Sequence, residues 1–148
     1  MPILQTGVSA PDFSLLDQDG KATSLSQFRG SYVLLYFYPK DDTPGCTKEA
    51  CMIRDIYNDF EKQGIVVLGV SKDSPSSHVK FREKYELPFT LLSDPDKKVI
   101  KQYGASAGIF TRRISYLIDP KGMIARVYPK VDPASHAGEI LKDIKDLK

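Results

Sequence analysis

The sequence has few of the residues and segments that mark several common classes of protein. It contains two cysteines and two histidines, and no pair beyond the cysteines has the spacing of metal ligands, so we expect no metal ion and no other cofactor. It has no glycine loop of the P-loop or dinucleotide-binding type. No apolar run approaches the ~20 residues that a membrane span requires. We therefore expect no phosphate-loop chemistry and no membrane partner.

The chain also has little excess charge of either sign. The formal net charge is +2, and the 21 basic residues are spread along the chain. Nucleic-acid binding domains concentrate positive charge on one face or along one helix. The sequence therefore predicts no nucleic-acid partner.

The low cysteine count bears on compartment and organisation. The first 13 residues lack a basic start followed by an apolar core, so we expect no secretion signal and a cytoplasmic location. In a reducing compartment a disulfide is more often transient and catalytic than structural. With 148 residues, no repeat and no linker-like stretch, we expect a single domain over residues 1–148.

Apolar runs and helical patterns alternate along the chain. Buried-strand patterns and turn signals predict strands over 12–17, 22–25, 32–38, 65–71, 89–94, 113–119 and 123–129. Helical periodicity predicts helices over 45–64, 74–86, 95–104 and 135–148. This order predicts an α/β fold in which a central mixed sheet is flanked by helices on both faces, with an N-terminal β-hairpin.

Both cysteines lie on the predicted helix 45–64, on different faces. At 100° per residue, Cys46 falls in the apolar stripe and Cys51 among polar residues. A cysteine like Cys46 is often only a small core residue. Cys51 has no packing reason to occupy a polar face, so the pair calls for a chemical explanation.

The position of Cys46 favours a reactive thiol. It follows Thr43, Pro44 and Gly45 directly after a predicted buried strand, so it occupies the first turn of the helix. Unpaired N–H groups and the positive end of the helix dipole favour a thiolate there, and the thiolate is the nucleophile. Pro44 and Gly45 keep bulky side chains away from the sulfur. The hydroxyl of Thr43 can both donate and accept hydrogen bonds in the same pocket.

Residues 36–51, YFYPKDDTPGCTKEAC, resemble the active-site segment of the peroxiredoxins. Pro39, Thr43 and Cys46 match the motif P-x-x-x-T/S-x-x-C. The second cysteine, five residues after the first, resembles the bacterioferritin comigratory protein, or Q-type, class. The resemblance covers nearly the whole chain, including VLGVSKDS, PFTLLSD and RRISYLIDPKG. It implies a thioredoxin-like fold, in agreement with the predicted layers.

The resemblance implies a thiol-dependent peroxidase that reduces hydrogen peroxide and organic hydroperoxides to water and alcohols. Cys46 matches the peroxidatic cysteine, which is oxidised to a sulfenic acid. Thr43 would align the peroxide oxygens, and Pro39 would shield the sulfur from water. Arg113 matches the arginine that stabilises the thiolate and the leaving oxygen. Glu49 matches a position that helps to hold this arginine, although an acid in a first helical turn is also an ordinary surface residue.

The resemblance also gives Cys51 the role of resolving cysteine, which forms an intramolecular disulfide with Cys46 that a thioredoxin-type protein then reduces. Residues five apart in a helix have Cα atoms ~8.5 Å apart. A disulfide tolerates about 7 Å at most. The first turns of the helix would therefore have to unwind in every cycle. Because both cysteines lie on one helix, catalysis needs no second subunit, and we expect a monomer.

Other interpretations of the sequence stay open at this stage. A disulfide oxidoreductase on the same fold is one alternative, although the C-x-x-C pair is missing. A non-enzymatic binding or chaperone module with incidental cysteines is another. Strand alternation predicts that Arg112 and Arg113 point to opposite faces, so that only one of them reaches the site. The spacing to the LID that follows favours Arg113. We expect His78 and His136 to be ordinary surface histidines.

Overall fold

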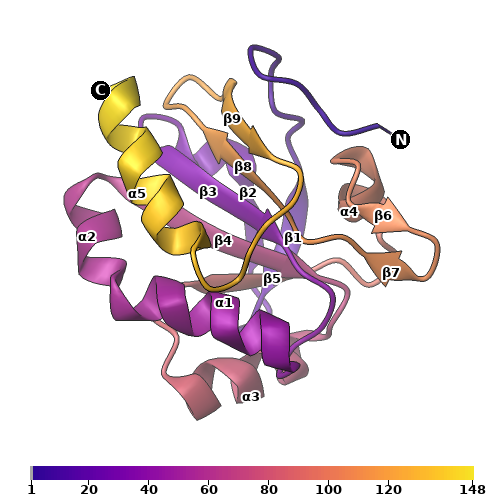
Figure 1. Cartoon of the computed structure of the whole chain (residues 1–148). Helices are drawn as coiled ribbons and strands as arrows, with labels where there is room; N and C mark the ends of the chain where they lie inside the picture. The colour runs from indigo at the N-terminus through magenta and orange to yellow at the C-terminus, as the bar shows by residue number, and fades with distance from the viewer. Residues whose placement is uncertain (1) are drawn as a thin grey trace.

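A computed structural model describes residues 2–148 and contains one large β-sheet in the order β2-β1-β5-β4-β3-β8-β9 (Figure 1). Strands β3, β4 and β5 are parallel to one another, and the remaining neighbours pair antiparallel. The predicted mixed sheet is thus confirmed, as is the N-terminal hairpin formed by β1 and β2. The strands of this sheet are β1 Ser14–Asp17, β2 Ala22–Ser24, β3 Tyr32–Phe37, β4 Ile65–Ser71, β5 Thr90–Ser93, β8 Ile114–Ile118 and β9 Ile124–Tyr128.

Helices cover both faces of the sheet. The helices are η1 Leu25–Phe28, α1 Pro44–Asp55, α2 Tyr57–Lys62, α3 Pro75–Tyr85, α4 Lys98–Gln102 and α5 His136–Leu147. Helices α1, α2, α3 and α5 supply apolar side chains to one core cluster, and α4, η1 and the N-terminal segment supply the other. Figure 1 shows α1 and α5 lying on the same face of the sheet.

The strand β3 joins the two cores because its side chains alternate between them. Leu34 and Tyr36 belong to the cluster beneath α1, whereas Leu35 and Phe37 belong to the opposite cluster. Since side chains alternate along a strand, a strand buried on both faces needs a continuous apolar run. The loop after β3 leads directly into α1, which places the first turn of α1 at the carboxyl end of this central strand.

The predicted helix 45–64 is wrong in one respect, because it is two helices. Ile56 leaves the helical conformation (φ −120°, ψ 24°), and its N–H donates to the Ile53 carbonyl three residues back. Such a tight turn ends α1 and starts α2. Ile53 and Phe60 are both fully buried, so the apolar spacing continues across the break. Periodicity alone therefore did not reveal it.

The expectation for the two histidines is also wrong. His78 is fully buried and His136 is 1% exposed. Both ring nitrogens of His136 are occupied, Nε2 by the Ser115 hydroxyl at 2.9 Å and Nδ1 by Glu139 at 3.2 Å. His78 likewise has a partner at each nitrogen. A buried imidazole is tolerated when both nitrogens are hydrogen-bonded, and these partners lie in other elements or one helical turn away.

Candidate active site

The first turn of α1 buries the sulfur of Cys46 at the end of β3. Thr43 is the N-cap residue, and the N–H of Thr47 donates to the Thr43 carbonyl at 2.8 Å. Cys46 is 2% exposed and packs in the same cluster as Tyr36 and Ala50. Cys46 therefore lies in the first turn of α1, and the N-terminal end of a helix stabilises a nearby negative charge.

Arg113 reaches this sulfur from the neighbouring strand. It directly precedes β8, whose first residue Ile114 pairs with Phe37 at the end of β3. The Arg113 Nη1 atom lies 3.5 Å from Cys46 Sγ and donates to Glu49 Oε1 at 2.9 Å. Arg112 is exposed, and both arginines lie in the short connection before β8 rather than in a strand, so their different directions come from this connection and not from strand alternation. A single guanidinium thus bridges the thiol and a carboxyl group.

Gly45 makes room for this guanidinium. A Cβ atom at position 45 would lie 2.8 Å from Arg113 Nη2, closer than such atoms approach one another. Any side chain at this position would force the guanidinium to shift. The absence of a side chain at Gly45 is therefore part of how the site is built.

Glu49 is buried, so the interpretation as a surface acid is wrong. Its side chain is 1% exposed, and burial raises its pKa from 4.5 to about 7, although Arg113 opposes the shift. Its second oxygen, Oε2, has no hydrogen-bond partner among the described residues. Near neutral pH a fraction of Glu49 is protonated, which leaves more of the Arg113 charge to the sulfur of Cys46.

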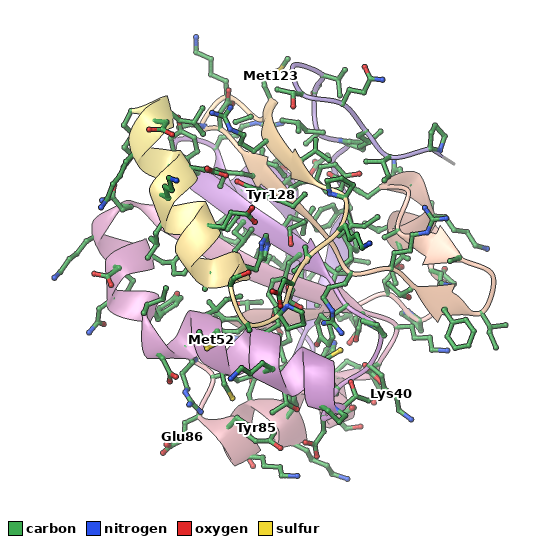
Figure 2. All side chains as sticks on the ribbon, in the orientation of Figure 1. Lys40, Met52, Tyr85, Glu86, Met123 and Tyr128 are labelled. Carbon is green, nitrogen blue, oxygen red and sulfur yellow. The ribbon has the colours of Figure 1, made fainter. Side chains whose placement is uncertain are left out.

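Thr43 and Pro39 lie on the loop between β3 and α1. The Thr43 hydroxyl donates to the Lys40 carbonyl at 2.8 Å, which leaves its oxygen lone pairs free to accept. Pro39 borders a cavity of about 280 Å³ together with Lys40, Lys72, Ile109, Phe110 and Thr111. Figure 2 shows Lys40 on the loop that leads into α1.

A larger cavity of about 310 Å³ lies at β1 and α4, over the opposite core cluster from Cys46.

Cys51 lies on the same helix in the reduced state. It is half-buried, and both cysteines are free thiols. Helix α1 is continuous from Pro44 to Asp55. Residues five apart in such a helix are ~8.5 Å apart at Cα, which exceeds the reach of a disulfide.

Among residues 2–148, no three side chains of the metal-ligating types come together.

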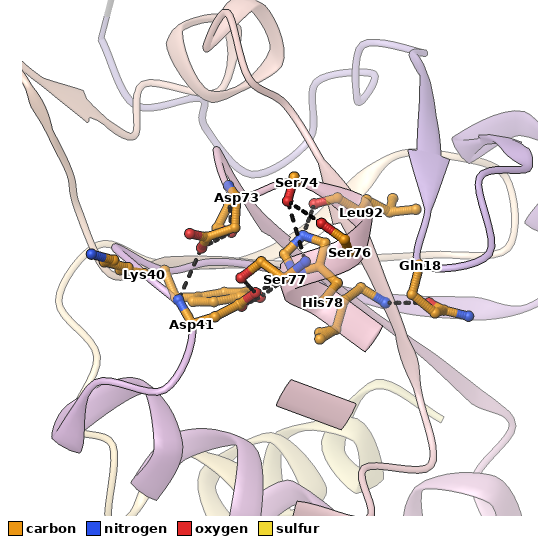
Figure 3. Close-up of polar contacts among 12 residues, drawn as sticks. Gln18, Lys40, Asp41, Asp73, Ser74, Ser76, Ser77, His78 and Leu92 are labelled. Atoms are coloured by element: carbon orange, nitrogen blue, oxygen red, sulfur yellow. Dashed lines mark hydrogen bonds and ion pairs between the residues drawn. The ribbon is translucent and has the colours of Figure 1, made fainter. Parts of the chain in front are cut away.

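A polar cluster behind the loop was not predicted from the sequence. Asp41 and His78 lie 37 positions apart in the sequence and are hydrogen-bonded in the structure (Figure 3). No spacing rule connects residues so far apart. The only sequence signal is the presence of an aspartate in an active-site loop, next to a second one at Asp42.

A buried thiol at a helix start, next to an arginine that also binds a buried carboxyl, is the arrangement that a thiol-dependent peroxidase requires. A model of the AhpC/TSA family matches residues 6–127. The chain therefore belongs to the AhpC/TSA family. Within it, the chain is a peroxiredoxin of the Q/bacterioferritin comigratory type, as similar curated relatives and solved structures indicate.

Two curated relatives illustrate the similarity. The putative chloroplastic peroxiredoxin Q of Oryza sativa subsp. indica is 48% identical over 145 residues, which cover 95% of this chain and 67% of the relative. The putative peroxiredoxin bcp of Coxiella burnetii is 47% identical over 148 residues, which cover 93% of this chain and 97% of the relative. The bacterial relative thus matches along nearly its whole length.

Solved structures show the same fold. Peroxidoxin BcpB from Mycobacterium tuberculosis superimposes with a TM-score of 0.91 at 32% identity, covering 98% of this chain and 99% of that one. A cysteine-to-serine variant of Xylella fastidiosa PrxQ gives a TM-score of 0.92 at 29% identity, covering 99% of each chain. The thioredoxin-like fold inferred from the sequence is confirmed.

Proposed function

We propose that Cys46 is the peroxidatic cysteine and that Cys51 resolves it within the same chain. The observation that carries the assignment is the position of Arg113 Nη1, 3.5 Å from Cys46 Sγ and 2.9 Å from Glu49 Oε1. The fixed positive charge of Arg113 stabilises the Cys46 thiolate and the negative charge that develops on a leaving oxygen. Glu49 holds the guanidinium in place.

In the first step the Cys46 thiolate attacks the nearer oxygen of the peroxide. An S–O bond forms as the O–O bond breaks, the sulfur becomes a sulfenic acid, and the leaving oxygen takes a proton to become water or an alcohol. Thr43 accepts a hydrogen bond from the peroxide hydroxyl through its free lone pairs, and so aligns the bond that breaks. Pro39 keeps bulk water from the sulfur.

In the second step the thiol of Cys51 attacks the Cys46 sulfenic acid and releases water as the disulfide forms. The protein is therefore an atypical two-cysteine peroxiredoxin. A thioredoxin-type dithiol then attacks the disulfide, becomes oxidised itself and returns both cysteines to thiols. The half-buried position of Cys51 supports this step, since the outer face of α1 is where a partner can approach once the turn opens.

The remaining expectations stay part of the proposal. Residues 1–148 act as one monomeric domain in the cytoplasm, a reducing compartment in which two cysteines form a transient rather than a structural disulfide. The plant relatives are named chloroplastic, so location varies among relatives. No helix among residues 2–148 is long and apolar enough to span a membrane. The small net charge of +2 supports the absence of a nucleic-acid partner.

The roles of the two cysteines are tested by replacing each with serine. Stopped-flow mixing of reduced protein with peroxide should show no reaction for Cys46→Ser. Cys51→Ser should react once at the wild-type rate, accumulate a sulfenic acid that a dimedone-type probe traps, and show no turnover with thioredoxin. An equal loss of the first, stoichiometric reaction in both variants would contradict the assignment.

A further inference from the structure

Hydrogen bonds from a buried polar cluster hold the loop that carries Pro39 and Thr43 (Figure 3). Asp41 is 7% exposed, and its two carboxylate oxygens have three partners. Oδ1 accepts from the Tyr38 hydroxyl at 2.6 Å, and Oδ2 faces the Ser77 hydroxyl at 2.8 Å and His78 Nδ1 at 2.7 Å. Side chains of one short loop and of α3 are thus joined at a single carboxyl group.

The histidine side of the cluster is fixed by the sheet. His78 Nε2 lies 3.0 Å from the Leu92 carbonyl of β5, and a carbonyl can only accept, so Nε2 carries a hydrogen. Nδ1 faces Asp41 Oδ2 at 2.7 Å, so both ring nitrogens lie within hydrogen-bond distance of a partner. A pair of this kind, removed from water and hydrogen-bonded throughout, is rigid and costly to break.

The backbone of the loop is fastened to the same region. The N–H of Asp41 donates to Asp73 Oδ2 at 2.9 Å, and the Ser71 hydroxyl donates to the same oxygen at 2.6 Å. The next residue, Asp42, has a positive φ of 58°, a conformation that a residue other than glycine keeps only when its surroundings hold it. The loop is therefore anchored to β4 and α3 through both side chain and main chain.

None of these hydrogen bonds involves a residue of α1. The loop is joined to α1 through the bond from the Thr47 N–H to the Thr43 carbonyl. Unwinding of residues 45–51 would break that bond and leave every contact of Asp41 in place. The cluster can therefore keep the loop in place while the start of α1 unwinds.

We propose that Asp41 and His78 are positioning residues for peroxide reduction, which hold the loop of Pro39 and Thr43 in its reactive geometry while the start of α1 unwinds and reforms. This inference rests on the proposed function, and it adds two residues that touch neither sulfur. Because a displacement of about 1 Å in a positioned group can cost up to ~10²-fold in rate, loss of the pair affects the peroxide step. The disulfide step depends on α1 and is unaffected.

The first test needs no variant. Amide exchange of the wild-type protein should show the Asp41 N–H protected in both redox states, whereas Thr47 exchanges faster once the disulfide has formed. If the Asp41 amide becomes as labile as that of Thr47 on oxidation, the loop moves with the helix and the inference is wrong. This outcome is independent of whether the chain turns over peroxide, so it is distinct from a failure of the proposed function.

The second test uses His78→Phe, which keeps an aromatic ring and removes both nitrogens, and His78→Asn, whose amide can restore a donor near Nδ1. We expect His78→Phe to lower the second-order rate constant for peroxide by about tenfold, with the rate of disulfide formation changed less than about twofold. His78→Asn should recover part of the loss. Lys84→Ala, which removes an exposed contact of α3 with Asp42, serves as the control and should change neither rate.

A merely structural role predicts a different pattern. His78→Phe would then lower the midpoint of thermal unfolding and leave the rate constant for peroxide unchanged at a temperature where the protein is folded. That result would overturn the inference, as would equal losses in His78→Phe and His78→Asn. If His78→Phe fails to fold, the comparison of His78→Asn with Lys84→Ala and the amide exchange of Asp41 decide the question.

Discussion

At the scale of single residues, the site balances one positive charge against two groups that can each be negative. Arg113 Nη1 contacts both Cys46 Sγ and Glu49 Oε1, and Glu49 Oε2 has no partner among the described residues. Two full negative charges beside one guanidinium, largely out of water, are unfavourable. Protonation of Glu49, whose pKa is raised by burial, relieves this excess.

The pKa of Glu49, raised from 4.5 to about 7 by burial, makes a prediction about stability. Between these values the folded protein binds a proton that the unfolded chain has released, so the contribution of Glu49 is full below about pH 4.5 and is lost as pH rises through 7. The loss amounts to about 3 kcal/mol. In a Cys46→Ser background, Glu49→Gln should therefore gain stability relative to the chain that keeps Glu49 as pH rises from 5 to 8.5, measured by denaturant unfolding.

A control for this experiment is Glu61→Gln, which replaces an exposed carboxyl on α2. It should change the free energy of unfolding little over the same pH range. If the difference in stability between the Glu49→Gln variant and the chain that keeps Glu49 does not vary with pH, the raised pKa is contradicted. A Glu49→Gln variant that becomes relatively less stable at high pH would show that the pair with Arg113 outweighs burial.

Sequence reasoning located the residues of the site better than it described their surroundings. The peroxiredoxin motif was enough to select Cys46, and the spacing to the LID that follows was enough to prefer Arg113 over Arg112. The burial of Glu49 depends on a guanidinium 64 positions away, and that of His78 on an aspartate 37 positions away. A local pattern on a helix contains no information about such partners. Both residues were therefore open to interpretation as surface groups.

At the scale of elements, the long buried strands were predictable and the short irregular ones were not. Residues 32–38 and 65–71 are continuous apolar runs, and β3 and β4 lie there. Strands β6 Ser106–Ala107 and β7 Phe110–Thr111, which pair as a small hairpin, are too short to show a period of two. The predicted helix 95–104 shrinks to α4 because the preceding residues form a turn, with Lys97 at φ 62°.

Helix α1 is the element that has to change conformation in the proposed catalytic cycle. In the reduced protein it is continuous over Pro44–Asp55, yet Cys46 and Cys51 cannot bond while it stays so. We predict that the oxidised protein has lost the turns around 45–51. Amides of residues 47–51 should exchange markedly faster after oxidation, while those of α2 stay protected. Equal protection in both states would mean that Cys46 is resolved by a thiol outside this chain.

Stiffening the same turns should slow the cycle at a defined step. Thr47→Ala replaces a β-branched residue by the best helix former, worth about 0.6 kcal/mol. If unwinding limits disulfide formation, its rate should fall about threefold, since ~0.6 kcal/mol is one RT. Cys46 should then be over-oxidised at lower peroxide concentration, which mass spectrometry detects as sulfinic acid. An unchanged rate of disulfide formation would show that another step is limiting.

At the scale of the whole molecule, the proposed reaction needs only one chain, because both cysteines, Arg113 and the loop belong to it. The most exposed large apolar side chains described are Ile109 at 77% and Phe110 at 69%, adjacent on the β6–β7 hairpin. A stable interface buries about 800 Å² from each partner and uses roughly 20–30 residues a side. Two neighbouring side chains provide far less than this area.

We therefore predict a monomer in both redox states. Sedimentation velocity at micromolar concentration should give one species with the mass of a single chain, and peroxidase activity per chain should not change on dilution. A dimer that persists at these concentrations would contradict the prediction. In that case Phe110→Ser would show whether the hairpin forms the contact, because removing this exposed ring from an interface would shift the equilibrium toward single chains, whereas on a monomer it would leave the sedimentation coefficient unchanged.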